Sequence, residues 1–211
     1  MTASGFALFD TTIGRCGIAW SERGVAGVQL PEADEGATRA RLGKRFSAAR
    51  EASPSGAVQA AIDGIVALLA GEPRDLTGIE LDSEPVPEFD RRVYAVARTI
   101  PPGATLTYGE IAARLGQPAE ARAVGQALGR NPFAIVVPCH RVLAAGGKVG
   151  GFSANGGVVT KLRLLAIEGA RTSDAPTLFA ATEFLSVRPE RTRSDGPGAA
   201  PITAGKPGAR A

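Results

Sequence analysis

The chain has 211 residues, of which 44% are hydrophobic and 5% aromatic, and its formal net charge is +3. No run of eighteen apolar residues occurs, which excludes a continuous apolar transmembrane helix, and the first ten residues lack the basic start and apolar stretch of a secretory signal. We therefore expect a cytoplasmic protein with no membrane partner, built from two small domains.

The net charge is unevenly distributed along the chain. Residues 1–84 hold 8 Lys/Arg against 12 Asp/Glu, residues 85–170 hold 10 against 5, and residues 171–211 hold 6 against 4. The basic surplus therefore lies in the middle segment, where a polyanion such as DNA would bind. A surplus of five charges is also compatible with an ordinary solvated surface, so charge alone leaves both interpretations open.

The first segment predicts a small α+β domain over residues 1–84. Apolar residues alternate at period two from Phe6 to Trp20, and Ser21-Glu22-Arg23-Gly24 supplies the turn of a hairpin. Helical spacing follows at 38–46 and 57–70, and Ile79 and Leu81 indicate a last short strand.

The second segment, residues 85–170, predicts a helical domain. Phe89–Ile100 has helical spacing, and Thr107 followed by Glu110 is a capping box that starts another helix. A third helix is expected over 119–128. Two helices joined by a short turn in a basic segment are typical of a helix-turn-helix, although most such pairs are purely structural.

The end of this segment alternates apolar and glycine-rich stretches. Phe133–Val137 is interpreted as a buried strand or extended segment, and 150–157 as a loop. A final helix carries Leu162, Leu165 and Ala166 and ends at Gly169. Residues 171–211 are rich in Pro, Gly, Ala, Ser and Arg and are expected to be disordered.

The single histidine, His140, directly follows Cys139, one of only two cysteines. Both cysteines are expected to be free thiols, with Cys16 in the core, and these residues are too few for a four-ligand zinc site. We therefore expect no metal and no cofactor.

A thiol attacks as the thiolate, which needs a nearby base or positive potential. His140 can act as that base through a bridging water, Arg141 adds positive charge, and a carboxylate elsewhere would orient the imidazole. The alternative is a buried cysteine after an apolar strand with a histidine at a turn.

Five stretches of the sequence carry a family resemblance. They are IVVPCHRV at 135–142, TYGEIAARLG at 107–116, ARAVGQAL at 121–128, Arg130-Asn131-Pro132 and Glu168-Gly169. Their order and content resemble the O6-alkylguanine-DNA alkyltransferases, or methylated-DNA–protein-cysteine methyltransferases, closely over about 85–170 and more loosely before it.

The resemblance implies a fold and an activity. The fold would be a ribonuclease-H-like amino-terminal domain followed by a winged helix-turn-helix-like domain that acts as a monomer on double-stranded DNA. Cys139 would take the alkyl group from O6-alkylguanine, or from O4-alkylthymine, in one irreversible turnover. His140 would relay the proton through water, and Glu168 would orient His140.

The resemblance also implies how damaged DNA is held. The helix at 119–128 would enter the minor groove, with its small residues Ala121, Ala123, Gly125 and Ala127 close to the backbone. Arg122 would fill the space of the extruded nucleotide, and Tyr108 would help to turn that nucleotide out and donate a hydrogen bond to it.

Further base and DNA contacts are implied for the loops. The carbonyls of Cys139 and Val142 would accept from the guanine amino group, the Ser153 N–H would hold O6, and Asn131 would brace the turn that presents the nucleophile. Arg141 is assigned to the DNA-binding set.

The chain departs from the family at 152–157, where Phe-Ser-Ala-Asn-Gly-Gly is two residues longer than the short Tyr-Ser-Gly-Gly form. This loop lacks the phenol and would admit bulkier alkyl groups. The cysteines of the zinc domain found in adaptive-response relatives are absent. Two other classes stay open: a DNA-binding module without chemistry, such as a lesion sensor or winged-helix regulator, and a cysteine hydrolase.

Overall fold

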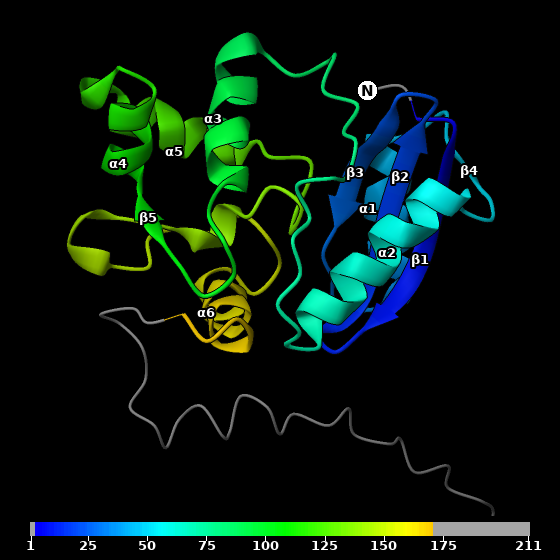
Figure 1. The fold of residues 1–211 in the computed structure, drawn as a ribbon. Helices are drawn as coiled ribbons and strands as arrows, with labels where there is room; N and C mark the ends of the chain where they lie inside the picture. Colours follow the sequence, from blue (N-terminus) through cyan, green and yellow to red (C-terminus); the bar gives the residue numbers. More distant parts are fainter. Residues whose placement is uncertain (1–2, 171–211) are drawn as a thin grey trace, which may run out of the picture.

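The computed structural model describes residues 3–170, and the expected disorder of 171–211 concerns residues outside this range. The described chain is a mixed α+β structure in which an amino-terminal sheet with two helices lies beside a mainly helical part (Figure 1). Within the described range no helix is long and apolar enough to cross a membrane.

The amino-terminal sheet has four strands in the order β3-β2-β1-β4. Strands β1 (Gly5–Thr11), β2 (Gly14–Ser21) and β3 (Gly24–Gln29) are antiparallel, whereas β4 (Arg50–Glu51) runs parallel to β1. The predicted turn after Ser21 is confirmed, since Ser21 pairs with Gly24, whose φ of 123° suits glycine.

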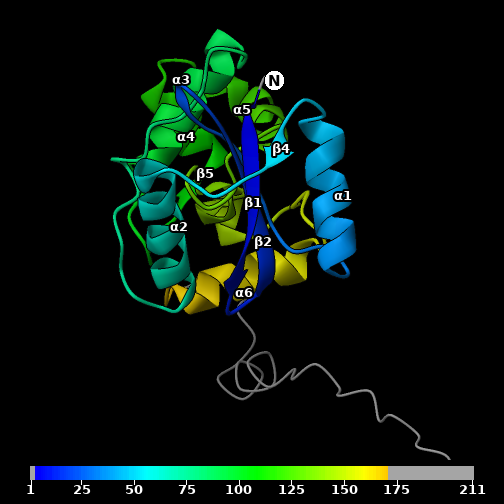
Figure 2. The ribbon, with the colours of Figure 1, turned by 90° about the vertical axis from the view of Figure 1, so that its right-hand side faces the viewer.

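Helices α1 (Glu35–Arg45) and α2 (Gly56–Leu69) cover opposite faces of this sheet (Figure 2). Ile18 packs in the cluster that contains residues of α2, and its neighbour Ala19 packs in the cluster that contains Leu42 of α1. Both faces of β2 are therefore buried. For this reason large and small residues alternate along the strand, rather than apolar and polar ones.

The predicted last strand at Ile79 and Leu81 is wrong. Leu81 forms only an isolated bridge with Val25, and Ile79 belongs to no strand. Two apolar residues at period two do not specify a strand without a longer partner edge to pair with.

The helical part confirms the predicted capping box. α3 (Glu88–Arg98) is followed by β5 (Leu106–Thr107), α4 (Tyr108–Arg114), a 3₁₀ turn η1 (Pro118–Glu120) and α5 (Ala121–Gly129). The Thr107 side chain accepts from the Glu110 N–H, while the Glu110 carboxylate accepts from the Thr107 N–H at 2.6 Å. α4 and α5 thus form two helices joined by a short turn.

The prediction of a strand or extended segment over Phe133–Val137 is wrong. The chain folds there into a tight turn in which the Val137 N–H donates to the Phe133 carbonyl at 2.8 Å. Ile135 has a φ of 71°, a left-handed conformation that costs a β-branched residue energy and that apolar patterning does not signal.

After this turn come η2 (Cys139–Arg141), β6 (Val142–Leu143), η3 (Ala145–Gly147) and α6 (Val158–Ile167). Gly169, with φ of 70°, follows the end of α6 as predicted. The predicted apolar face is partly wrong: Leu165 is buried, but Ala166 is exposed, and Leu164 and Lys161 are buried instead.

One hydrophobic cluster includes residues from the sheet, from α2 to α6 and from the 133–137 turn. The Val28 N–H of β3 donates to the Pro132 carbonyl at 2.8 Å, and Val28 bridges to Phe133. The sheet therefore contacts the segment that leads to Cys139.

Candidate active site

The turn before Cys139 is held from inside by Asn131. Its Oδ1 accepts from the Phe133 N–H at 2.9 Å, and its Nδ2 donates to the Val137 carbonyl at 2.8 Å. One amide thereby ties both ends of the turn, and the Cys139 N–H donates back to the same Val137 carbonyl. Asn131 occupies the bracing position predicted for it.

His140 and Glu168 form a buried pair. Nε2 of His140 in η2 lies 3.0 Å from Oε1 of Glu168, which caps the carboxyl end of α6. The His140 side chain is 1% exposed and that of Glu168 is 4%. The structure thus places Glu168 against His140, the residue that directly follows Cys139 in the chain.

The Nδ1 atom of His140 is buried and has no hydrogen-bond partner within residues 3–170. Because Nε2 faces the carboxylate, Nδ1 is the nitrogen left to take a proton. A histidine whose second nitrogen is held by a carboxylate has the tautomer and orientation of a general base.

The assignment of Arg141 to DNA contact is wrong. Its side chain is 6% exposed, and its Nε and Nη2 both donate to the Glu168 carboxylate at 2.8 Å. Its Nη1 donates to the Ile100 carbonyl at 2.5 Å. A guanidinium with these partners has no free face for a phosphate, so Arg141 positions Glu168 instead.

The electrostatics of the pair favour an ionised carboxylate. Burial alone would raise the pKa of Glu168, but hydrogen bonds from His140 and Arg141 outweigh it and hold that pKa at about 2. Burial lowers the pKa of His140, against the raising effect of Glu168. The imidazole is therefore kept neutral and able to accept a proton.

The Cys139 thiol is half-buried, and burial raises its pKa. The side chain of Asn131 and the positive charge of Lys161 act in the opposite direction. The thiolate is thus formed only with help from its neighbours, which limits its reactivity toward solvent electrophiles.

Lys161 is the functional candidate that sequence reasoning missed. It is 0% exposed, its Nζ donates to the Val142 carbonyl at 2.6 Å, and it lies 5.9 Å from the centre of the Tyr108 ring. Burial lowers its pKa to about 8, opposed by Cys139. The spacing in the sequence could have indicated this residue. Lys161 precedes Glu168 by seven residues and so lies on the same face of α6.

Tyr108 lies at the start of α4, between α5 and the glycine-rich loop. A Cβ added at Gly125 would lie 3.8 Å from its ring, and one added at Gly150 would lie 3.7 Å from it. Burial raises the pKa of the phenol, and the charge of Cys139 adds to this effect. The phenol therefore remains a hydrogen-bond donor at neutral pH.

Helix α5 combines an exposed arginine with half-buried small residues. Arg122 is exposed, and Ala121, Ala123 and Gly125 are half-buried, as close approach of a ligand requires. Ala127 is wrongly placed in this face by the sequence prediction, because it is 0% exposed and belongs to the core.

Two residues predicted to contact the base, Val142 and Ser153, differ in exposure. Val142 is fully buried, and its carbonyl already accepts from Lys161, although a carbonyl has a second lone pair. Ser153 is exposed in the loop, and its Oγ lies 3.4 Å from the Gly129 carbonyl. Ser153 thus lies beside the end of α5.

A cavity of about 180 Å³ opens at the nucleophile. Cys139 and Asn131 line it, together with Phe152, Ser153 and Ala154 of the loop and with residues of β3 and α1. The cavity is thus built between the two parts of the molecule.

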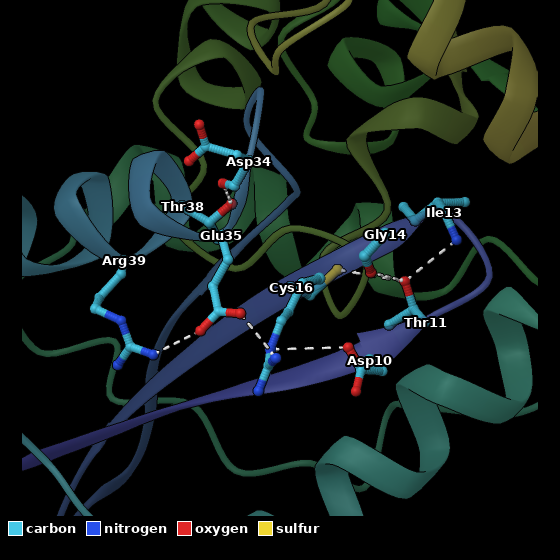
Figure 3. Close-up of polar contacts among 10 residues, drawn as sticks. Asp10, Thr11, Ile13, Gly14, Cys16, Asp34, Glu35, Thr38 and Arg39 are labelled. Carbon is cyan, nitrogen blue, oxygen red and sulfur yellow. Dashed lines mark hydrogen bonds and ion pairs between the residues drawn. The ribbon is translucent and has the colours of Figure 1, made fainter. Parts of the chain in front are cut away.

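The other cysteine lies in the sheet, away from any base. Cys16 is 0% exposed, as predicted, and its sulfur lies 3.7 Å from the Thr11 hydroxyl (Figure 3). Nearby charged groups pair with one another, as Glu35 does with Arg15 and Arg39. Across residues 3–170, no group of three or more His, Cys, Asp or Glu side chains is arranged to hold a metal ion.

Comparison with known proteins gives consistent matches. Residues 88–170 match the 6-O-methylguanine DNA methyltransferase, DNA binding domain. A methylated-DNA–protein-cysteine methyltransferase of Mycolicibacterium paratuberculosis is 49% identical over 119 residues, 56% of this chain and 70% of that protein. One from Methanothermobacter thermautotrophicus is 39% identical over 153 residues, 72% and 78% of the two chains.

Solved structures extend the match to the fold. Mycobacterium tuberculosis OGT in complex with DNA has 35% identity and a TM-score of 0.64, covering 83% of this chain and 99% of that one. The O6-methylguanine-DNA methyltransferase of Pyrococcus kodakaraensis has 30% identity and a TM-score of 0.62, covering 78% and 99%.

Proposed function

Because the chain belongs to the family of methylated-DNA–protein-cysteine methyltransferases, we propose that it repairs DNA by moving an alkyl group from O6 of guanine onto Sγ of Cys139. The observation that carries the proposal is the buried His140–Glu168 pair next to Cys139, with Nδ1 of His140 unpartnered among the described residues. That arrangement supplies a base for one thiol.

In the proposed reaction, His140 takes the thiol proton through a water molecule, and the thiolate attacks the alkyl carbon. The carbon–O6 bond breaks, its electrons remain on the guanine, and the guanine takes up a proton. The product on the protein is a thioether, which has no low-energy route back to the thiol. Each molecule therefore repairs one lesion, and O4-alkylthymine is a second lesion of the same chemistry.

We propose that α5 enters the minor groove of double-stranded DNA. Its exposed Arg122 would take the place of the flipped nucleotide, and its small half-buried residues support a close approach to the backbone. Tyr108 is within van der Waals reach of this helix and would donate a hydrogen bond to the flipped base. Flipping costs a few kcal/mol, and less for a poorly paired damaged base.

The flipped guanine would be read by backbone groups. The free lone pairs of the Cys139 and Val142 carbonyls would accept from its amino group, and the Ser153 N–H would donate to O6. Lys161 supports this arrangement, because its bond to the Val142 carbonyl fixes the direction of that group.

The finer architecture is also proposed. Strand order β3-β2-β1-β4, with β4 parallel to β1, supports a ribonuclease-H-like unit over 1–84. The α4–α5 pair with the β5–β6 ribbon supports a winged helix-turn-helix-like unit over 85–170. A monomer in the reducing cytoplasm, at the nucleoid during repair, agrees with chemistry that needs one free thiol.

The test is incubation of the protein with a duplex that carries one O6-methylguanine, followed by mass analysis of the peptides. We expect a single methyl group on the Cys139 peptide, restored guanine, and a yield that never exceeds one per protein. Cys16→Ala is the matched control and should transfer normally. An unmodified Cys139 peptide with the lesion intact at equimolar protein would overturn the proposal.

A further inference from the structure

The end of α5 is held by a buried carboxylate of α3. Arg130, the residue that follows α5, donates from Nε and Nη2 to the two oxygens of Asp90, at 3.0 and 2.9 Å. The Asp90 side chain is 3% exposed, whereas that of Arg130 is 57% exposed. A two-bond pair of this kind fixes the orientation of the guanidinium as well as its distance. Because the carboxylate lies in the interior, the pair fixes where the chain leaves α5.

A second residue of α3 holds the same end of α5. Tyr94 is buried, and its hydroxyl donates to the Ala127 carbonyl at 2.9 Å. Its ring lies edge-on to that of Phe133, with the ring centres 6.3 Å apart. Residues four apart lie on one face of a helix, so Asp90 and Tyr94 form one contact surface. This face of α3 therefore contacts the chain on both sides of Asn131.

Asn131, which lies between these contacts, interacts with the nucleophile. Its amide nitrogen carries two N–H groups, and it donates to the Val137 carbonyl at 2.8 Å. Burial raises the pKa of the Cys139 thiol, and a hydrogen bond from the Asn131 side chain lowers it. A hydrogen bond stabilises a charged group only while the donor is correctly placed. The position of the Asn131 amide therefore affects how easily Cys139 loses its proton.

From these contacts we infer that Asp90 is a positioning residue for the alkyl transfer: through Arg130 it holds the Asn131 amide against the sulfur of Cys139. The inference rests on the proposed function. It differs from a purely structural role of the ion pair, because an ion pair that only stabilises the fold would leave the reactivity of the thiol unchanged.

Other titratable side chains also interact with the Cys139 thiol. They are Tyr94 of α3, Tyr108 of α4 and Lys161 of α6, and the base His140 follows in the chain. Burial raises the pKa of both phenols, so neither carries a charge near neutral pH. The lysine belongs to a different helix and stays in place when α3 is altered.

The sign of the effect separates positioning from direct electrostatics. Removing the negative charge of Asp90 would by itself favour the thiolate, so the Cys139 thiol would ionise at lower pH. Loss of the hydrogen bond from Asn131 has the opposite effect, because the thiolate loses a donor. Only the positioning role therefore predicts a thiol that ionises at higher pH when the carboxylate is neutralised.

The experiment measures two properties of Asp90→Asn in the full chain, well below its melting temperature. The first is the single-turnover rate of methyl transfer from a duplex with one O6-methylguanine. This rate should fall about three- to tenfold, because a small misplacement of a reacting group is costly. The second is the pH profile of iodoacetamide alkylation of Cys139 in a Cys16→Ala background, which should move to higher pH.

Two further variants test the route of the effect. Tyr94→Phe keeps the ring and removes the hydrogen bond to the Ala127 carbonyl, so it should move the profile in the same direction by a smaller amount. In an Asn131→Ala background, Asp90→Asn should cause no further shift, because the amide that it positions is gone. A shift of full size in that background would overturn the inference.

Asp82→Asn is the matched control. Asp82 is 1% exposed and accepts two hydrogen bonds from Arg23, whose side chain is 54% exposed, but this pair lies at the turn between β2 and β3. The control should lose stability and keep the transfer rate and the thiol profile of the unaltered protein.

An Asp90→Asn variant that behaves like this control, or whose thiol profile moves to lower pH, would overturn the inference. Absence of methyl transfer by the unaltered protein would instead refute the proposed function. The two failures are distinguishable, because the alkylation profiles are measured without DNA.

Discussion

The two cysteines of this chain lie in two regions that differ in the polar groups near the thiol and in how these groups affect its pKa. In the sheet, burial raises the pKa of Cys16 to about 12, and among the described residues the hydroxyl of Thr11 opposes it. Beside α6, burial also raises the pKa of Cys139, but an amide, a lysine and two backbone groups act against the effect.

Burial therefore raises the pKa of both thiols, although Cys16 is 0% exposed and Cys139 is half-buried at a cavity. The difference lies in the groups that act on the sulfur: a hydroxyl in one region, and in the other an amide, a buried ammonium group and two backbone groups, with the base His140 next in the chain. A reactive cysteine is thus defined by polar groups that other elements bring to it, and each of these groups can be removed in turn.

The largest effect on the transfer rate should come from replacing each of the two cysteines in turn. Cys139→Ser should abolish methyl transfer, whereas Cys16→Ala should leave the rate unchanged and lower the free energy of unfolding by about 1 kcal/mol, because it removes one buried sulfur. Transfer kinetics and urea unfolding measure the two quantities. Residual transfer in Cys139→Ser that disappears on mutation of Cys16 would remove the contrast between the regions.

Glu168→Gln should slow transfer about a hundredfold, because an amide neither fixes the imidazole tautomer nor stabilises its charged form. The same change leaves Arg141 buried without a counter-ion, which should cost about 3 kcal/mol of stability. Single-turnover rates measured well below the melting temperature separate the two effects. Glu72→Gln, at an exposed pair with Arg74, is the control and should alter neither quantity.

Acid should destabilise the Cys139 region through Glu168. The pKa of Glu168 is lowered from 4.5 to about 2, so its contribution is fully present above pH 4.5 and is lost as the pH falls toward 2. We expect a loss of about 3 kcal/mol across this window, measured by urea unfolding at several pH values. Glu168→Gln should flatten this part of the profile; an equally steep profile would assign the acid sensitivity to other carboxylates.

Lys161→Met should give the smallest effect, about a tenfold slower transfer at pH 7, because the thiolate loses a nearby cation. The pKa of Lys161 is about 8, so the difference from the unaltered protein should shrink as the pH rises above 8 and the lysine itself becomes neutral. Iodoacetamide alkylation of Cys139 against pH, in a Cys16→Ala background, measures this. Lys161→Arg should retain part of the rate; a pH-independent defect would indicate a purely structural role.

Local signals in the sequence were sufficient where the chain interacts with its own neighbours. The Thr107–Glu110 capping box, the turn before Gly24 and the helix end at Gly169 depend on residues a few positions apart, and all three predictions are confirmed. Family motifs located Cys139, His140 and Glu168, which the structure brings together.

Predictions from the sequence were wrong where contacts with distant segments determine the local structure or the burial of a side chain. An apolar run at Phe133–Val137 fits a strand, but contacts with β3 and Asn131 turn it back on itself. A lysine and an arginine are expected at the surface, yet Lys161 and Arg141 are buried because the acceptors they meet come from other elements. No local pattern indicates such acceptors.

The outer edge of β3 affects how readily variants of the protein would aggregate. Its backbone is paired at two points by other segments, through the Val25 N–H to the Glu80 carbonyl at 2.9 Å and the Val28 N–H to the Pro132 carbonyl at 2.8 Å. An uncovered strand edge is a template for intermolecular pairing. The segment that presents the nucleophile thus also shields the protein from self-association, and variants that loosen it should aggregate as well as lose activity.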